Sequence, residues 1–194
     1  MQVVILDYGA GNVRSVQFAL ERLGIDSVLS NDSETILSAD RIIFPGQGEA
    51  ESAMKKLRQY GLDRLLPELK QPLLGICLGM QLMFDASEEG DTKGLGIIHG
   101  QVKRFTQGKI PQVGWNTIEE LQGPLFQNIP ELSYMYLVHS YYAPLVTETS
   151  ATSTYGIRYT VAIQKDNFFG VQFHPEKSSK AGQQLLENFI YLDV

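Results

Sequence analysis

The stretch PLLGICLGMQLMF, residues 72–84, contains the single cysteine of the chain and joins two kinds of secondary structure. Its apolar run LLGI, residues 73–76, is typical of a short buried strand. The segment LGMQLMFDAS, residues 78–87, predicts a helix that begins at once. A strand, a tight turn and a helix in immediate succession indicate βαβ units and therefore a mostly parallel sheet with helices on both faces.

The rest of the N-terminal half repeats this order of elements. Strands are predicted at 2–6, 25–30 and 39–46, and helices at 13–23, at 49–58 and in a short piece before Pro72. Parallel strands end along one edge of their sheet. We therefore expect the endings DYGAGN, PGQGEAE and CLGMQ to face a common crevice.

The C-terminal half is rich in short strand-like segments separated by turns. These segments lie at 96–105, 109–120, 132–143, 149–155, 157–165 and 168–176, and a last helix is predicted near 180–192. They suggest antiparallel strands added to the sheet. The predicted fold is thus α/β, with a flavodoxin-like, mostly parallel central sheet, and because no linker or internal repeat interrupts it we expect one domain over residues 1–194.

The composition narrows the class of protein. A net charge of −6 argues against nucleic acid or an anionic membrane as a main partner. One cysteine in 194 residues allows no internal disulfide and favours a reducing compartment. The start MQVVILDYGAGN lacks the basic and apolar regions of a signal peptide, and no apolar run is long enough to span a membrane. A cytoplasmic protein is expected.

Cofactor and metal motifs are absent from the sequence. GAGN, residues 9–12, begins like a dinucleotide fingerprint, but Arg14 stands where the third glycine belongs. No Cys, His and carboxylate cluster has the spacing of metal ligands. We expect neither a metal nor a cofactor.

Cys77 lies between Gly75 and Gly79 in the pattern G-x-C-x-G, the thiol counterpart of the nucleophile elbow G-x-S-x-G. A nucleophile on a sharp strand-to-helix turn crowds the backbone on both sides, and glycine relieves that crowding. The helix N-terminus that follows favours a thiolate. A buried structural cysteine is the alternative, and the two glycines favour the nucleophile.

The chain has three histidines that are candidates for the base a nucleophilic cysteine needs. His99 in GIIHGQV and His139 in YLVHSYY lie in apolar, strand-like runs, so both are predicted to be core histidines. His174 instead ends the last strand, in GVQFHPEKSS.

His174 is followed by Pro175 and Glu176, and the proline rules out a helix there. In an extended segment residues i and i+2 point the same way, so Glu176 can orient the imidazole. Cys77, His174 and Glu176 are therefore predicted to be nucleophile, base and orienting carboxylate.

Acyl transfer also needs donors for a developing oxyanion. The backbone N–H of Leu78, directly after the nucleophile, is one candidate. The glycine loop FPGQG, residues 44–48, lies at a neighbouring strand end and offers the amides of Gly46 and Gln47.

GICLGMQ together with FHPE resembles the class I, triad-type glutamine amidotransferases. DYGAGN, PGQG, CLGMQLMF, VGWN, HSYY and FHPEKSS, which run from residue 7 to 179, narrow the resemblance to the glutaminase subunits of imidazole glycerol phosphate synthases. The resemblance implies that Cys77 attacks the side-chain amide of glutamine to give a thioester. It also implies that Gln81 and Glu89, with the backbone of Ser140 and Tyr141, bind the glutamine.

The resemblance implies a heterodimer with a (β/α)8 cyclase subunit, which receives the ammonia through a tunnel. The cyclase makes imidazole glycerol phosphate and aminoimidazole carboxamide ribotide in histidine biosynthesis. Asn12, Trp115 and Lys177 are the expected interface residues. Gln47 occupies a loop position where the family often has a small aliphatic residue. If this loop completes the oxyanion hole only with the partner bound, the isolated chain should be a weak glutaminase.

Three alternatives remain open. One is the glutaminase of another pathway, for anthranilate, guanylate or pyridoxal phosphate. Another is a stand-alone γ-glutamyl thiol hydrolase. The third is a non-catalytic flavodoxin-like module, which would leave Cys77 and His174 without a joint purpose.

Overall fold

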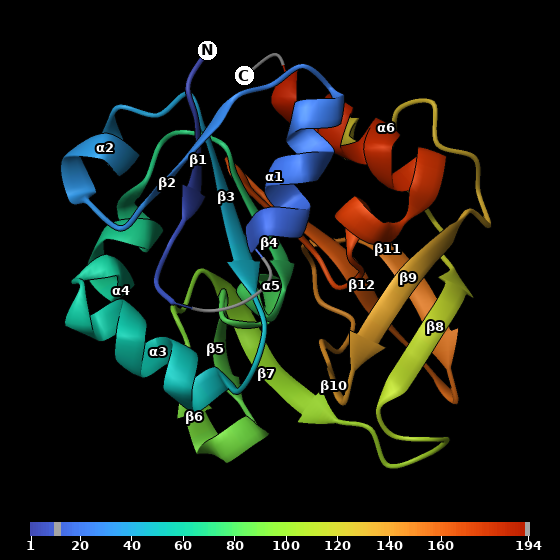
Figure 1. The fold of residues 1–194 in the computed structure, drawn as a ribbon. Helices are drawn as coiled ribbons and strands as arrows, with labels where there is room; N and C mark the ends of the chain where they lie inside the picture. Colours follow the sequence, from blue (N-terminus) through green and yellow to red (C-terminus); the bar gives the residue numbers. More distant parts are fainter. Residues whose placement is uncertain (10–12, 193–194) are drawn as a thin grey trace.

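The computed structural model describes residues 1–9 and 13–192, and a seven-stranded sheet with the order β11-β12-β13-β4-β3-β1-β2 forms its centre (Figure 1). Five neighbouring strands are parallel: β2 (Ser27–Ser30), β1 (Val3–Leu6), β3 (Arg41–Gly46), β4 (Leu73–Cys77) and β13 (Phe168–Val171). Antiparallel strands complete the sheet beyond β13: β12 (Ile157–Lys165) and β11 (Thr149–Tyr155). The predicted α/β class is confirmed.

Helices cover both faces of this sheet. α1 (Val13–Arg22) and α6 (Ser179–Ile190) pack on the face to which Val3 and Ile5 of β1 contribute. The opposite face, with Val4 of β1, is covered by α2 (Ser33–Leu37), α3 (Ala50–Gln59) and α4 (Leu62–Leu65). Alternate residues of β1 thus enter different cores, as expected for a strand buried on both sides.

The helices predicted at 13–23, 49–58 and 180–192 are confirmed within two residues. Helix α2 was not predicted, although its start carries a capping signal. The side chain of Asp32 accepts a hydrogen bond from the backbone N–H of Thr35, 2.9 Å away, and so satisfies a donor at the helix start.

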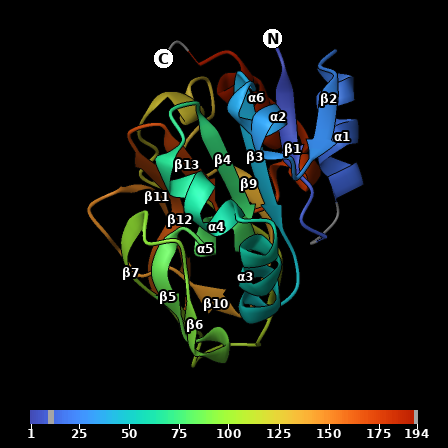
Figure 2. The same ribbon diagram turned by 90° about the vertical axis from the view of Figure 1, so that its left-hand side faces the viewer.

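Two smaller sheets complete the architecture. One has the order β10-β7-β5-β6, formed by β10 (Tyr141–Tyr142), β7 (Ile98–Arg104), β5 (Phe84–Ser87) and β6 (Thr92–Lys93). The other is an antiparallel ribbon of β8 (Gln112–Thr117) and β9 (Tyr134–His139). Of the segments expected to extend the central sheet as antiparallel strands, β11 and β12 do so. Strand β13 also joins the central sheet but is parallel to β4, so its expected direction is wrong. The others form the two smaller sheets. Figure 2 shows β5, β6, β7 and β10 beyond the lower end of the central sheet.

The helix predicted at 78–87 is wrong beyond its first turn. Helix α5 spans only Leu78–Gln81, and the chain then becomes strand β5. Phe84 pairs with Ile98 of β7, while Ala86 and Ser87 pair with both β6 and β7. The apolar run fits a helix locally, but partners supplied by a later part of the chain make it a strand.

Short 3₁₀ turns connect several elements. They are η1 (Leu66–Glu68), η2 (Glu89–Asp91), η3 (Pro124–Phe126) and η4 (Pro175–Lys177). Turn η4 begins at Pro175, so the expectation that this proline excludes a helix is wrong: proline fits the first position of a helical turn, where its missing N–H would have no partner. The turn places the carboxylate of Glu176 next to the imidazole of His174.

His99 was expected in the core, and that expectation is wrong. Its side chain is 85% exposed and lies 3.4 Å from a carboxylate oxygen of Asp85. Strand β7 is buried on alternate residues near its start, so Ile98 points inward and His99 points to solvent. His139 is buried, as expected.

Candidate active site

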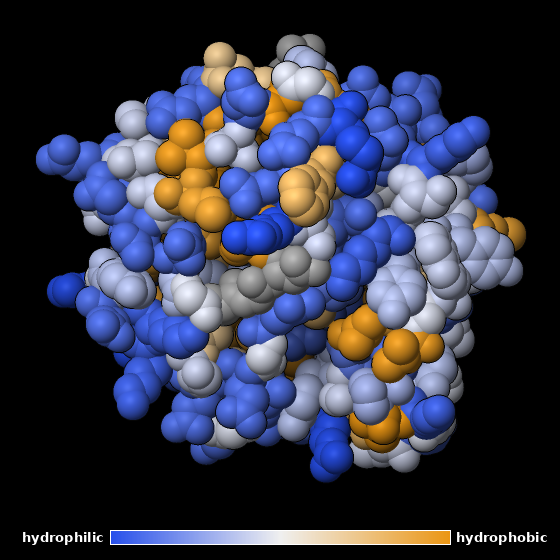
Figure 3. Space-filling model, viewed as in Figure 1, coloured by the Kyte–Doolittle hydropathy of each residue, from blue (hydrophilic) through white to orange (hydrophobic). Residues whose placement is uncertain are grey.

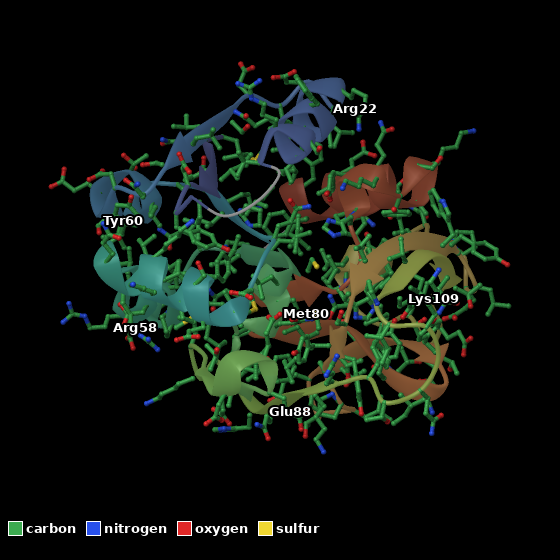
Figure 4. All side chains as sticks on the ribbon, turned by 60° about the horizontal axis from the view of Figure 1, so that its bottom comes forward. Arg22, Arg58, Tyr60, Met80, Glu88 and Lys109 are labelled. Atoms are coloured by element: carbon green, nitrogen blue, oxygen red, sulfur yellow. The ribbon has the colours of Figure 1, made fainter. Side chains whose placement is uncertain are left out.

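The carboxyl ends of the parallel strands meet beside a pocket of about 500 Å³. In Figure 1 the arrowheads of β1, β3 and β4 all point toward this edge, and Figure 4 looks onto it, with Met80 of α5 near the centre and Glu88 and Lys109 farther out. The pocket is lined by Gln47, Gly48, Cys77, Leu78, Gln81, Glu89, Pro111, Val138, His139, Ser140, Tyr141, His174 and Lys177. The PGQG and CLGMQ endings therefore share one crevice, as predicted. Of the third predicted ending, DYGAGN, residues 7–9 do not line this pocket and residues 10–12 lie outside the described residues.

Cys77 occupies a strained backbone position at the junction of β4 and α5. Its φ is 55° and its ψ is −110°, a combination that a residue with a side chain rarely adopts. Such a conformation costs on the order of 1–3 kcal/mol and persists only where the surrounding structure enforces it. The strain turns the thiol out of the sheet and into the pocket.

The two glycines beside Cys77 are required by close backbone contacts. A Cβ on Gly79 would collide with the carbonyl oxygen of Phe44 in β3. A Cβ on Gly75 would lie 2.8 Å from the backbone nitrogen of Met80, closer than real Cβ contacts. Gly79 is thus packed against β3 and Gly75 against the backbone of α5, and only hydrogen fits at either position.

His174 and Glu176 form a buried pair beside the thiol. Nδ1 of His174 lies 2.9 Å from Oε1 of Glu176, and the two side chains are 5% and 2% exposed. A carboxylate accepts, so Nδ1 carries the proton and Nε2 is the nitrogen left for the hydrogen bond with Cys77. Oε2 of Glu176 has no hydrogen-bond partner among the described residues, so His174 is the charge that balances this buried carboxylate.

The two pocket histidines have opposite protonation preferences. Burial lowers the pKa of His174, but its hydrogen bonds to Cys77 and Glu176 and their negative charges outweigh burial and raise the pKa to about 10. Burial lowers the pKa of His139 to about 4, and the charge on His174 contributes to the shift. At neutral pH His174 is therefore a cation and His139 is neutral.

Neutral His139 holds a backbone carbonyl at the pocket wall. Its Nδ1 lies 2.7 Å from the carbonyl oxygen of Tyr141, which also accepts a hydrogen bond of 3.0 Å from Nε2 of Gln81. Both lone pairs of that carbonyl are occupied, so it is not free to bind a ligand. The groups left at this wall are the side-chain oxygen of Gln81 and the carboxylate of Glu89.

Glu89 combines a structural contact with a place in the pocket. Its Oε2 accepts a hydrogen bond of 2.9 Å from the backbone N–H of Ala50, the first residue of α3. Burial raises the pKa of Glu89 despite this bond. The other carboxylate oxygen can face a ligand cation.

The glycine loop after β3 lies next to the elbow. Gly46 pairs with Cys77 in the β3–β4 register. The hydroxyl of Tyr8, which is buried, donates a hydrogen bond of 2.7 Å to the carbonyl of Pro45 and so fixes the start of the loop. Sequence analysis missed Tyr8, because nothing local marks the tyrosine of DYGAGN as reaching β3.

The expected interface residues lie at the rim of this edge. Lys177 lines the pocket, and with Trp115 it lines a neighbouring hollow of about 340 Å³. The indole of Trp115 is 51% exposed and stacks edge-on against Tyr136, with ring centroids 5.9 Å apart. Asn12 lies outside the described residues.

Trp115 belongs to the outer face of the β8–β9 ribbon, which the register defines as Val113, Trp115, Thr117, Tyr134, Tyr136 and Val138. Val113 and Tyr134 are exposed by 59% and 62%, whereas Met135 and Leu137 on the other side of the ribbon are buried. Figure 3 shows hydrophobic surface at the lower right, in the region where Figure 1 draws β8–β10. An apolar face of this kind, next to a pocket, is typical of an interaction site.

The described residues hold no group of three or more His, Cys, Asp or Glu side chains that could bind a metal ion. Nor does that part of the chain contain a helix of the length and apolarity needed to cross a bilayer.

Comparison with known proteins gives consistent matches over the whole chain. The family model of glutamine amidotransferase class-I matches residues 4–192. The imidazole glycerol phosphate synthase subunit HisH of Bacteroides fragilis (strain YCH46) is 48% identical over 196 residues, covering 99% of this chain and 100% of that protein. The subunit of the same name from Yersinia pseudotuberculosis serotype I is 48% identical over 194 residues, covering 98% and 99%. The structure of PurLQS from Thermotoga maritima matches with a TM-score of 0.73 at 16% identity, covering 97% of each chain, which supports the fold.

Proposed function

The chain belongs to the glutamine amidotransferase class-I family, among the HisH glutaminase subunits of imidazole glycerol phosphate synthase, and from this premise we propose how its residues release ammonia from glutamine. The observation that carries the proposal is the imidazole of His174, which bridges Cys77 and Glu176 at a pocket large enough for an amino acid. A charged imidazole next to a thiol favours the reactive thiolate.

Glutamine binding is assigned to the wall around Gln81 and Glu89. Both hydrogens on Nε2 of Gln81 are used, on the carbonyl of Tyr141 and on Oε1 of Gln172, so its Oε1 remains to accept from the ligand. Glu89 attracts the α-ammonium group. The carbonyls of Ser140 and Tyr141 already accept hydrogen bonds within the protein, so the backbone N–H groups of this segment are the groups proposed to bind the α-carboxylate.

The first chemical step forms a bond between Cys77 Sγ and the side-chain amide carbon. The electron pair of the C=O bond moves onto oxygen, where the N–H of Leu78 and the N–H of Gly46 or Gln47 stabilise the charge. Imidazolium His174 then gives its Nε2 proton to the amide nitrogen. The C–N bond breaks, ammonia leaves, and a glutamyl thioester remains on Cys77.

The second step regenerates the thiolate. Neutral His174 accepts a proton from water, whose oxygen attacks the thioester carbon. The C–S bond breaks, and its electron pair returns to Cys77 as glutamate leaves. Glu176 keeps the proton on Nδ1 throughout, so that Nε2 is always the nitrogen that exchanges protons with the reactants.

Replacing Glu176 with glutamine is expected to lower kcat for glutamine hydrolysis by about 100- to 10,000-fold, the range typical of lost acid–base catalysis. The pKa of His174 is raised to about 10 partly by this carboxylate, so activity should persist to about that pH in the unmodified protein. Without the carboxylate the pKa falls. The alkaline limb of the pH profile should then move to lower pH.

The measurement is ammonia release across pH 6–11, with Glu187→Gln on the surface helix α6 as a control. The control should have the same pH profile as the unmodified protein. A Glu176→Gln protein with an alkaline limb at the original position would contradict the proposed role of the carboxylate.

The partner is proposed to be a (β/α)8 cyclase that docks over the pocket mouth and receives the ammonia. The outer face of the β8–β9 ribbon supplies exposed apolar surface there, and Trp115 is its largest side chain. Arg22, Lys177 and Lys180 line the hollow next to Trp115, so acidic groups are expected on the facing surface of the cyclase.

The functional test is glutamine hydrolysis by the purified chain with and without the cyclase from the same source. We expect the loop after Gly46 to complete the oxyanion hole only when the partner is bound. The isolated chain should therefore be at least about tenfold slower, in line with the few kcal/mol lost with an oxyanion-hole donor. Equal rates alone and in the complex would contradict this partner dependence.

A pair of variants assigns the effect to the proposed surface. Trp115→Ala should raise the Kd of the complex, whereas Tyr60→Ala, another exposed aromatic at the end of α3, should leave it unchanged. Titration of the labelled chain with the cyclase measures both. Loss of affinity in neither variant, or in both, would place the interface elsewhere.

A further inference from the structure

Gln172 is a fully buried polar residue next to the nucleophile. Strand β13 pairs with β4 in the register Gly170↔Gly75 and Val171↔Ile76, which brings Gln172 level with Cys77 at the end of the ladder. Phe173 points the other way, into the core under α6. The sequence Gln-Phe-His therefore places Gln172 and His174 on the same side of the chain, where each contacts the thiol.

The hydrogen bonds around Gln172 determine the orientation of its side-chain amide. The backbone carbonyl of Tyr141 can only accept, so Nε2 of Gln81 faces it at 3.0 Å. The same Nε2 also donates to Oε1 of Gln172, at 2.8 Å. The amide nitrogen of Gln172 must then face Cys77, and its Nε2 lies 3.6 Å from Sγ.

The sulfur has two different kinds of neighbour. As a thiol it can donate to the carbonyl of Val138, 3.8 Å away. As a thiolate it can only accept, and the donors in reach are His174 and Nε2 of Gln172. A hydrogen bond to an ionised acceptor is about twice as strong as one between neutral groups. Gln172 therefore favours the charged sulfur and holds it in place from the side that His174 does not cover.

We propose that Gln172 is a positioning residue, which donates a hydrogen bond to the Cys77 thiolate and links it through Gln81 to the wall that binds glutamine. The inference rests on the proposed role of Cys77 as the nucleophile. A contact between ligand and Oε1 of Gln81 would tighten a chain of hydrogen bonds that ends on the reacting sulfur. Occupation of the pocket and alignment of the nucleophile are coupled in this way.

Gln172→Met tests the donor, because methionine keeps the length and apolar volume of glutamine without an N–H. The readout is the rate of iodoacetamide alkylation of Cys77 in the full-length chain between pH 5 and 10, which follows the thiolate. We expect a rate about tenfold lower at neutral pH and a midpoint at higher pH. In the complex with the cyclase, kcat should fall about ten- to a hundredfold, and KM should rise as well, because methionine also removes the acceptor that holds Nε2 of Gln81.

Gln112→Met is the matched control. Gln112 is also a buried glutamine and accepts a hydrogen bond from the hydroxyl of Tyr159, but it has no hydrogen bond to Cys77. Its alkylation profile should match that of the unmodified chain. If both methionine variants shift the profile alike, the effect is one of general packing and the proposal is wrong.

A second variant, Gln172→Glu, tests the proposal in case Gln172→Met does not fold. Glutamate keeps the acceptor for Gln81 but turns an oxygen toward the sulfur, so the midpoint of its alkylation profile should move to still higher pH. An unshifted midpoint in either folded variant overturns the proposal. Slow alkylation of the unmodified chain at neutral pH would instead count against Cys77 as the nucleophile, so the two failures are distinguishable.

Discussion

Replacing Cys77 with alanine should lower glutamine hydrolysis by about 10⁴-fold or more, the scale reached when an enzyme loses its nucleophile. The change removes the sulfur on which the thioester forms and leaves His174 without a group to activate. Cys77 lines the pocket but is only 8% exposed and belongs to the core covered by α1 and α6, so the change also removes the packing contacts of one buried sulfur atom. We expect the free energy of unfolding to fall by about 0.5–1.5 kcal/mol, the usual cost of removing one buried group.

The measurement is glutamate and ammonia release by the complex with its cyclase, alongside cyclase activity with added ammonium salt. The alanine variant should lose the glutamine-dependent reaction and keep the ammonium-dependent one, since the cyclase consumes ammonia from either source. Cys77→Ser should behave similarly, because an alcohol is a weaker nucleophile. Residual hydrolysis within tenfold of the unmodified complex would exclude the thioester route.

The largest effect on stability is expected from Gly79→Ala. The new Cβ would overlap the carbonyl oxygen of Phe44, so β3 and α5 must separate at a junction where both are buried. Overpacking of a core typically costs 1–3 kcal/mol, and a clash with backbone cannot be relieved by a rotamer change. We expect a loss of at least about 3 kcal/mol and a fall in Tm of about 6–12 °C.

Urea unfolding followed by circular dichroism measures this loss, and Gly24→Ala is the control. A Cβ at Gly24 meets no atom within 4 Å, but the residue has a φ of 73°. Alanine there should cost only about 1–2 kcal/mol, from the left-handed backbone alone. Equal losses at the two glycines would show that the contact with Phe44 relaxes easily.

The features that sequence analysis predicted well are those with local signals. The pattern G-x-C-x-G predicts the elbow because backbone atoms lie too close to each glycine for a side chain to fit. The contact between His174 and Glu176, two residues apart, was predicted correctly but for the wrong reason, because Pro175–Lys177 form a 3₁₀ turn and not an extended segment. Strands β1, β3 and β4 were also recognisable, because they are apolar runs bounded by turns, whereas β13 was expected to be antiparallel and its parallel pairing with β4 was missed.

The features that were missed depend on segments distant in sequence. Strand β5 looks helical until β6 and β7 pair with it. His99 looks buried until the alternation of β7 turns it outward. The hydroxyl of Tyr8 reaches β3 across the sheet, 37 residues away in sequence. Gln172 had a local signal, because the alternation in Gln-Phe-His places it on the same side of the chain as His174. Its position next to Cys77, however, follows only from the register between β13 and β4.

The left-handed backbone at Cys77 has a consequence for how this chain can change over evolution. The residue proposed as the nucleophile has a backbone conformation that a side chain tolerates poorly and that glycine would adopt with less strain. Selection for thermal robustness alone would therefore favour loss of the thiol. A cysteine at this position therefore sets activity against stability, a trade-off built into a single residue.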